Sequence, residues 1–224
     1  LFASCAFAVL IPMPMSYAAA EAQPAAKPSD ADTRFGKLPL YFEKNQGQTH
    51  DQVSFLSRGP GYTLYLTPSE VVLVPSVKPG GSTPSDTAQV PSEASDPVLR
   101  MRLLGADPNP VMRGVGRQQG RSNYFIGNRP SNWLTDIPHF SRVHYQSVYP
   151  GIDLVYHGSR DALEFDFIIA PDTDPGSIGL LLEGADDLRL DDQGNLVLHA
   201  ASHRTTLRAP VIYQDGDAGR EYVS

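Results

Sequence analysis

The stretch Leu163-Glu164-Phe165-Asp166-Phe167-Ile168-Ile169 decides the fold class of this chain. Its odd positions are all apolar, and its two acids fall between them. Because successive side chains of a β-strand point to opposite faces, one face of this stretch is apolar and the other carries the carboxylates. The stretch therefore predicts a half-buried strand of a sheet.

The same two-residue period recurs through the chain from position 35 onward. It is clearest at 62–66, 99–103 and 152–156, and further candidate strands lie at 53–57, 71–77, 140–145, 178–183, 188–190, 196–199, 205–207 and 211–214. Turn residues separate these segments, and no stretch of helical length shows caps and a 3.6-residue period. The sequence therefore predicts an all-β domain, an antiparallel β-sandwich or open-barrel-like fold with long loops.

One stretch interrupts this rhythm. Residues 75–97 are rich in Pro, Ser, Gly and Thr, which is the composition of either a linker between two domains or a long loop within one. We favour the loop, because the few strands that precede it could not close a core alone. The prediction is a single β-rich domain over 35–224 that continues beyond the given sequence.

The amino end has the layout of an export signal. Residues 1–11 are apolar and uncharged but too short to span a bilayer, and the small-residue stretch 16–20 follows them. We predict a signal peptide at 1–20, truncated at its start, and a disordered spacer at 21–34. The alternative is a short buried helix or strand of the mature protein.

Charge and cysteine content exclude several classes of protein. There are 18 Lys and Arg residues against 25 Asp and Glu, which gives a net charge of −7, and the cations are scattered. No nucleic-acid partner is expected, because phosphate binding needs clustered cations. Cys5 is the one cysteine of the chain, which excludes an intramolecular disulfide and a cysteine-based zinc site. If the signal peptide is removed, the mature protein has none.

Two carboxylates on the predicted strand at 163–169 are the first catalytic candidates. Glu164 and Asp166 share a face about 7 Å apart, within the range of inverting glycosidase pairs, and Asp153 on a neighbouring strand could join them. A solvated outer face is the competing interpretation, and we favour it because charged side chains are mostly exposed.

The chain lacks the motifs of nucleotide binding, serine acyl transfer and zinc peptidases. Four acids, Asp186, Asp187, Asp191 and Asp192, flank a Gln-Gly-Asn turn, but their pattern is that of a β-turn rather than of a calcium loop. We expect no catalytic residue, no cofactor and no metal site.

Aromatic residues crowd one region of the chain, at Tyr124, Phe125, Trp133, Phe140, Tyr145, Tyr149 and Tyr156. If exposed, they could bind a sugar or a protein, with Tyr124, Trp133 and Tyr149 as the ligand contacts. If buried, they are core residues, which is the interpretation that we favour.

Several segments, in order, resemble a known domain. They are 42–48 (FEKNQGQ), 53–68 (VSFLSRGPGYTLYLTP), 123–128 (NYFIGN), 148–158 (VYPGIDLVYHG), 163–171 (LEFDFIIAP) and 184–185, with Trp133 between them. The chain resembles the uncharacterised N-terminal domain of bacterial SBBP-repeat (β-propeller repeat) cell-surface proteins. The resemblance implies a location behind a signal peptide and ahead of propeller or immunoglobulin-like repeats, which would be its partners in the full-length chain. It assigns no catalytic residues.

The leading hypothesis is therefore a non-enzymatic module of a secreted or cell-surface bacterial protein with a scaffold or adhesion role, whose external partner is a surface glycan or protein. A carbohydrate-binding module is the first alternative. A glycoside hydrolase, or an accessory domain of one, is the second.

Overall fold

The computed structural model describes residues 3–10, 40–59, 62–75, 98–159, 162–200, 203–216 and 219–223. Its first eight strands are β1 (Ala3–Leu10), β2 (Phe42–Lys44), β3 (Phe55–Gly59), β4 (Tyr62–Leu66), β5 (Glu70–Pro75), β6 (Leu99–Leu104), β7 (Val111–Tyr124) and β8 (Leu134–Tyr149). The others are β9 (Ile152–Ser159), β10 (Ala162–Ile169), β11 (Gly179–Glu183), β12 (Asp187–Leu190), β13 (Leu196–Ala200), β14 (His203–Leu207), β15 (Val211–Gly216) and β16 (Gly219–Val223). Two 3-10 turns, η1 (Pro130–Asn132) and η2 (Pro175–Ser177), interrupt them.

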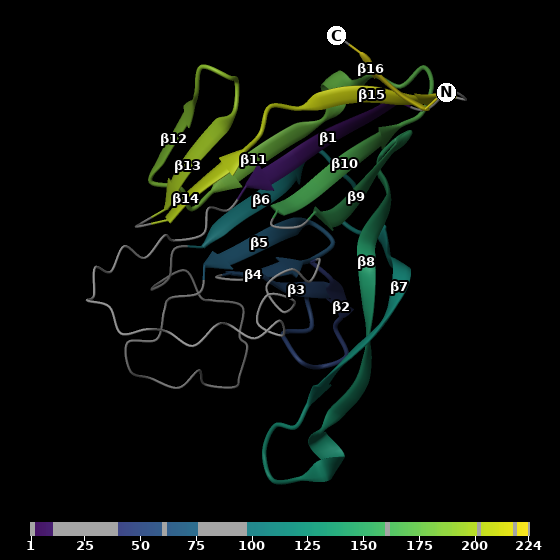
Figure 1. Cartoon of the computed structure of the whole chain (residues 1–224), viewed down its shortest axis with the longest axis vertical. Helices are drawn as coiled ribbons and strands as arrows, with labels where there is room; N and C mark the ends of the chain where they lie inside the picture. Colours follow the sequence, from purple (N-terminus) through teal and green to yellow (C-terminus); the bar gives the residue numbers. More distant parts are fainter. Residues whose placement is uncertain are drawn as a thin grey trace, which may run out of the picture.

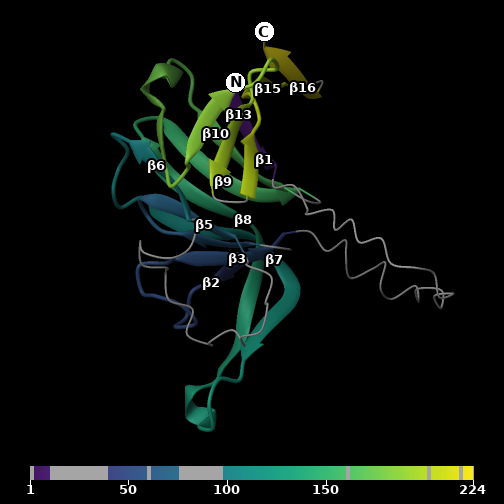
Figure 2. The same ribbon diagram turned by 90° about the vertical axis from the view of Figure 1, so that its left-hand side faces the viewer.

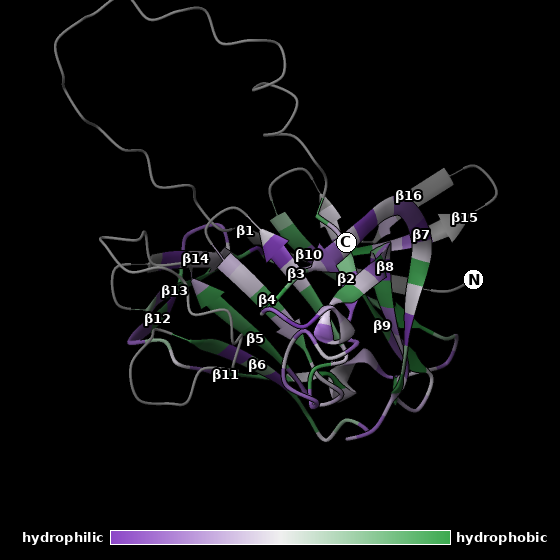
Figure 3. Ribbon diagram, turned by 90° about the horizontal axis from the view of Figure 1, so that it is seen from below, coloured by the Kyte–Doolittle hydropathy of each residue, from purple (hydrophilic) through white to green (hydrophobic). Residues whose placement is uncertain are grey.

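All sixteen strands belong to one antiparallel sheet. Hydrogen-bonded neighbours follow the order β11-β6-β5-β4-β3-β2-β8-β9-β10-β1-β14-β13-β12, and β15 pairs with β1 and β16. The sheet is strongly curled into a half-barrel (Figure 1 and, from below, Figure 3). The described residues contain no α-helix, and none of them forms a helix long and apolar enough to cross a membrane.

The strand that decides the fold class behaves as its alternation predicts. In β10, Leu163, Phe165 and Phe167 are at most 3% exposed, whereas Glu164 and Asp166 are half-buried. The three apolar side chains belong to one core cluster together with residues of most of the other strands. The all-β antiparallel prediction is confirmed, and its shape is the open, barrel-like one.

Two long strands leave the sheet as a projecting arm. β7 and β8, joined by a turn that contains η1, run well beyond the ends of their neighbours (Figure 1, Figure 2). β8 also pairs with β2 and β9, whereas β7 pairs with β8 alone in the described part of the chain. Register shifts between Arg117 and Arg121, and between Ser122 and Tyr124, interrupt the β7–β8 pairing. We call β7, β8 and the turn between them the arm.

Most of the predicted ends and loops lie outside the described residues. This holds for the spacer at 21–34 and for the loop at 75–97 except Pro75, which ends β5. Within the predicted signal peptide, Ala3–Leu10 forms β1, which pairs with β10, β14 and β15. Strand pairing does not decide whether the segment is cleaved after export, so the signal peptide stays a prediction.

Candidate functional site

Three large apolar side chains are exposed at the end of the arm. Phe125 is 63% exposed, Ile126 41% and Trp133 38%. Phe125 and Ile126 follow β7 directly, and Trp133 follows η1 and precedes β8, so the turn brings them to one place. We call these three residues the tip. Exposed apolar groups that gather on a projecting element are typical of binding surfaces.

The tip is a fixed arrangement. The rings of Phe125 and Trp133 meet edge to face, with centroids 5.2 Å apart and planes at 82°. The Trp133 indole Nε1–H donates to the carbonyl oxygen of Gly127 at 3.1 Å, and Gly127 has a φ of 75° that favours glycine. The Trp133 amide donates to the Pro130 carbonyl at 3.1 Å, which closes η1. These contacts orient the indole before any partner arrives, which lowers the entropic cost of binding.

A buried carboxylate ties the arm to the sheet. Glu43 on β2 is 2% exposed and accepts hydrogen bonds from the Ser122 hydroxyl at 2.6 Å and the Tyr124 hydroxyl at 2.5 Å. Arg58 on β3 donates to the Tyr124 hydroxyl, and its guanidinium lies 3.7 Å from the Glu43 carboxylate. A buried charge is tolerated when it is paired and hydrogen-bonded in this way.

His139 on β8 completes this group, which we call the anchor: Glu43, Arg58, Ser122, Tyr124 and His139. Its Nε2 lies 2.8 Å from the Ser122 hydroxyl oxygen, and its ring stacks on Tyr41 with centroids 3.9 Å apart. Burial lowers the pKa of His139, against an opposing effect of the Glu43 carboxylate. The imidazole is therefore neutral at pH 7.

Serine, histidine and a carboxylate in contact invite comparison with a catalytic triad. In a triad the histidine accepts the serine proton, and the acid holds the other ring nitrogen. In the anchor, the Ser122 hydroxyl donates to Glu43, so the Nε2–H of His139 is the donor to the Ser122 oxygen. The serine proton is directed to the acid and not to the imidazole, which differs from the direction of proton transfer in a triad.

The family model described as a domain of unknown function (DUF7948) matches residues 42–224, which include the anchor and the whole arm. The chain belongs to this family. No curated protein and no solved structure matches the chain. The arrangement of its side chains is therefore the evidence for what this DUF7948 domain binds or does.

The three aromatic residues predicted as ligand contacts of this DUF7948 domain lie in three different places. Trp133 is exposed at the tip, and Tyr124 lies in the anchor. Tyr149, at the end of β8, is 4% exposed, and its hydroxyl donates to the Leu104 carbonyl at 2.9 Å. The three predicted ligand contacts therefore do not form one surface. Tyr149 is a core residue, like Tyr145 and Tyr156, as the favoured interpretation of the aromatic residues predicts.

The predicted carboxylate candidates lie beside histidines, on the face of the sheet opposite the core side chains of β9 and β10. Glu164 and Asp166 on β10 both contact His157 on β9, at 3.6 Å from Nδ1 and 3.1 Å from Nε2 respectively. Asp153 pairs with His144 Nε2 at 2.8 Å and accepts the Ser147 amide at 2.7 Å. An imidazole thus lies between the two acids, where an inverting glycosidase would hold its water.

The acidic turn is built as the sequence predicts. Asp191 accepts the amides of Gln193 and Asn195, each at 2.9 Å, and the Gly194 amide donates to the Asp191 carbonyl at 3.0 Å. The Asn195 side-chain amide, which donates to the second carboxylate oxygen at 2.9 Å, and the Asn195 and Gln193 backbone amides lower the pKa of Asp191. Among the described residues, no group of three or more His, Cys, Asp or Glu is placed to hold a metal ion.

Proposed function

We propose that this domain is a non-enzymatic binding module with an adhesion or scaffold role, and that the tip is its contact surface. The observation that carries the proposal is the exposed, edge-to-face Phe125–Trp133 pair at the end of a projecting arm. Tryptophan and other aromatic side chains dominate the binding energy of protein interfaces. Tyr124 directly precedes Phe125, so the anchor fixes the arm close to these rings, and the arm presents them on an element that projects from the body (Figure 2).

A carbohydrate is the second candidate partner. The exposed indole of Trp133 supports it, because aromatic rings with a polar edge are suited to surfaces that are partly apolar and partly wet. Ile126 beside the rings favours a protein surface instead, since an aliphatic side chain adds apolar area without a hydrogen bond.

Binding of the purified domain to bacterial cell envelopes tests the role of the tip. We expect the double variant Phe125→Ser/Trp133→Ser to lose at least about tenfold of the affinity, as is typical when hot-spot aromatics are truncated. Tyr222→Ser is the matched control, because Tyr222 is 72% exposed but lies on β16. Equal retention of the double variant and the wild type would overturn the proposal.

A glycan array separates the two partner classes. The chain has one tryptophan, so the emission of Trp133 reports on the tip alone. A carbohydrate that shifts this emission and fails to bind Trp133→Ser would support the carbohydrate-binding alternative. Envelope binding without any glycan signal supports a protein partner.

We further propose that the domain is exported and acts beside the repeats of SBBP-type surface proteins, secreted or at the cell surface. The apolar run at 1–11 and the small-residue stretch that follows it support export. The motifs between 42 and 185, which occur in the same order as in SBBP-repeat proteins, support a relationship to those proteins. Mass spectrometry of the tagged chain from fractionated cells tests export. Recovery outside the inner membrane without residues 1–20 is expected, whereas uncleaved protein in the cytosol would contradict it.

A further inference from the structure

A cavity of about 300 Å³ opens between the β4–β5 turn, the end of β6, and strands β8 and β9. Apolar side chains form most of its walls, among them Met101, Leu103, Val148, Leu154, Tyr145 and Tyr156. Ser69, Gly105 and Asp107 at its mouth are exposed, so the cavity communicates with solvent. Its volume falls at the lower end of the range for small-molecule sites, about 300 to 1,000 Å³.

Two buried tyrosines in this cavity differ in one respect. Their rings meet at a centroid distance of 5.4 Å, and Tyr145 is 3% and Tyr156 2% exposed. The Tyr145 hydroxyl donates to the Thr67 carbonyl at 3.0 Å. Within the part of the chain that the structure describes, the Tyr156 hydroxyl has no hydrogen-bond partner. A buried hydroxyl without a partner is costly, and such groups are rare in native proteins.

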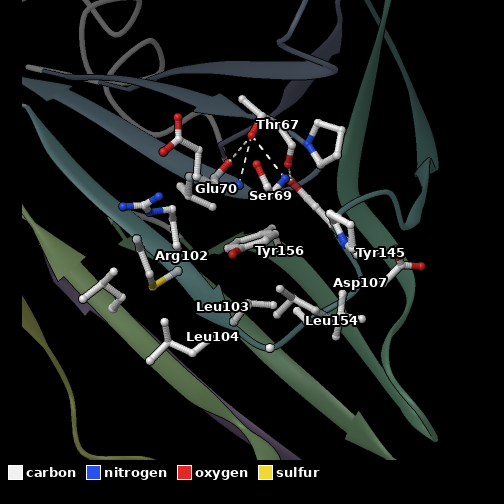
Figure 4. Close-up of a pocket in the computed structure, with 18 residues that line it drawn as sticks. Thr67, Ser69, Glu70, Arg102, Leu103, Leu104, Asp107, Tyr145, Leu154 and Tyr156 are labelled. Carbon is white, nitrogen blue, oxygen red and sulfur yellow. Dashed lines mark hydrogen bonds between the residues drawn. The ribbon is translucent and has the colours of Figure 1, made fainter.

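The Tyr156 ring lies in the middle of the cavity-lining residues (Figure 4). Thr67, Ser69 and Glu70 are on one side of it, and Leu103 and Leu104 are on the other. Burial raises the pKa of Tyr156, so its hydroxyl keeps its proton at neutral pH and can donate it.

Two of the charged side chains around the mouth are paired, and the third, Asp107, is exposed and accepts the Asn109 amide at 2.9 Å. Glu70 binds Arg100 at 2.8 Å, and Arg102 binds Glu183 at 2.5 Å. The Thr67 hydroxyl is engaged with the Glu70 carbonyl at 3.0 Å and with the Glu70 amide at 3.0 Å. These pairs leave the Tyr156 phenol as the buried polar group of the cavity without a partner among the described residues. The Asp107 carboxylate lies at the exposed mouth, apart from the Tyr156 ring (Figure 4).

We propose that this cavity binds a small, uncharged, mainly apolar molecule whose single hydrogen-bond acceptor receives the Tyr156 hydroxyl. The apolar walls supply the affinity for the body of the ligand, and the phenol selects for the acceptor. The site is separate from the tip, so the inference does not depend on the proposed function.

Two fluorinated probes of nearly equal shape test the proposal by ¹⁹F NMR titration of the full chain. The first probe, 4-fluoroacetophenone, carries one carbonyl acceptor, and the second, 1-ethyl-4-fluorobenzene, lacks it. We expect the ketone to bind about fivefold more tightly, the value of one net hydrogen bond. Tyr156→Phe should abolish this preference while keeping the affinity for the hydrocarbon. Ala106→Phe, at the cavity wall, should weaken both probes.

Tyr145→Phe is the matched control, because the hydroxyl that it removes already donates a hydrogen bond to the Thr67 carbonyl. This variant should retain the preference for the ketone. Failure of both probes to bind the wild type at millimolar concentration would overturn the proposal and assign the cavity to water. An unchanged preference in Tyr156→Phe would also overturn it.

Discussion

The Tyr124 hydroxyl donates a hydrogen bond to the Glu43 carboxylate at 2.5 Å, although 81 positions separate the two residues in the chain. Tyr124 is the last residue of β7, and Glu43 is the middle residue of the three-residue strand β2. The contact therefore joins the far part of the arm to one of the shortest strands of the sheet. A projecting element of this length needs such an attachment, because few core contacts hold it otherwise.

Replacing Glu43 with glutamine should detach this support. The amide carries no charge for Arg58, and its NH₂ group faces a hydroxyl that now donates to the carboxylate. We expect Glu43→Gln to lower the free energy of unfolding by about 2 kcal/mol, measured by urea denaturation.

Glu164→Gln is the control for Glu43→Gln, because Glu164 is a partly exposed carboxylate that lies 3.6 Å from His157 Nδ1. It should cost less than about 1 kcal/mol. Equal losses in the two variants would mean that the anchor contributes no more than a surface ion pair.

The anchor should also make stability depend on pH. Burial lowers the pKa of His139 below its value in the unfolded chain, which is about 6.5. Below that pH the unfolded chain binds the proton more readily, so the stability contributed by the neutral imidazole is lost as the pH falls from 6.5 toward the folded pKa. We expect His139→Gln to show a shallower loss of stability between pH 7 and 5 in thermal melts. A parallel loss in both proteins would contradict this prediction.

The two tyrosines of the cavity should respond in opposite directions to loss of their hydroxyls. Tyr145→Phe leaves the Thr67 carbonyl without its donor and should lower stability by about 1 kcal/mol. Tyr156→Phe removes a buried hydroxyl that lacks a protein partner and should leave stability unchanged or raise it by about 1 kcal/mol. Chemical denaturation of both variants measures the difference. A loss in Tyr156→Phe as large as that in Tyr145→Phe would mean that its hydroxyl is already partnered.

The tip should be independent of the stability of the sheet. Phe125→Ala removes the edge-to-face partner of the Trp133 ring, so quenching of Trp133 fluorescence by acrylamide should increase. The free energy of unfolding should change by less than about 0.5 kcal/mol, as is usual for exposed positions. A large destabilisation would instead assign the pair to the folding core.

Alternation of apolar residues predicted most of the sheet but not the outer strand of the arm. β10 and β9 follow the two-residue period, because one face of each strand is buried in the core. β7 reads VMRGVGRQQGRSNY and has no such period, because none of its side chains is fully buried, and among the described strands it pairs with β8 alone. Gly114 lies under the Phe140 ring, where a Cβ atom would come within 2.5 Å of Cγ. The glycines of β7 therefore allow close packing within a strand, although in the sequence they are typical of a loop.

The exposed Trp133 was among the predicted ligand contacts, but the anchor was not predicted. Glu43 is a single acid in a short strand, and its partners Ser122 and Tyr124 lie 79 and 81 positions away. Spacing motifs in a sequence identify residues that share one strand or helix. The anchor depends instead on the strand register that brings β2 beside β8 and β7. The sequence could not show that Tyr149 is a core residue and Trp133 a surface residue, because both are aromatic and only the fold decides which of them is buried.

The lone pairing of β7 has a consequence for how copies of this protein meet in solution. Within the described part of the chain, one edge of β7 pairs with no strand, and a free edge of this length is a template on which a second chain could add a strand and start a fibril. Here the Arg121 guanidinium donates to the carbonyls of Gln118 and Gly120, at 2.7 and 2.8 Å, and so occupies acceptors of its own strand. Arg113 and Arg117 are exposed along the same strand and repel a second copy of it. The basic residues of β7 are thus placed to oppose edge-to-edge pairing of two arms.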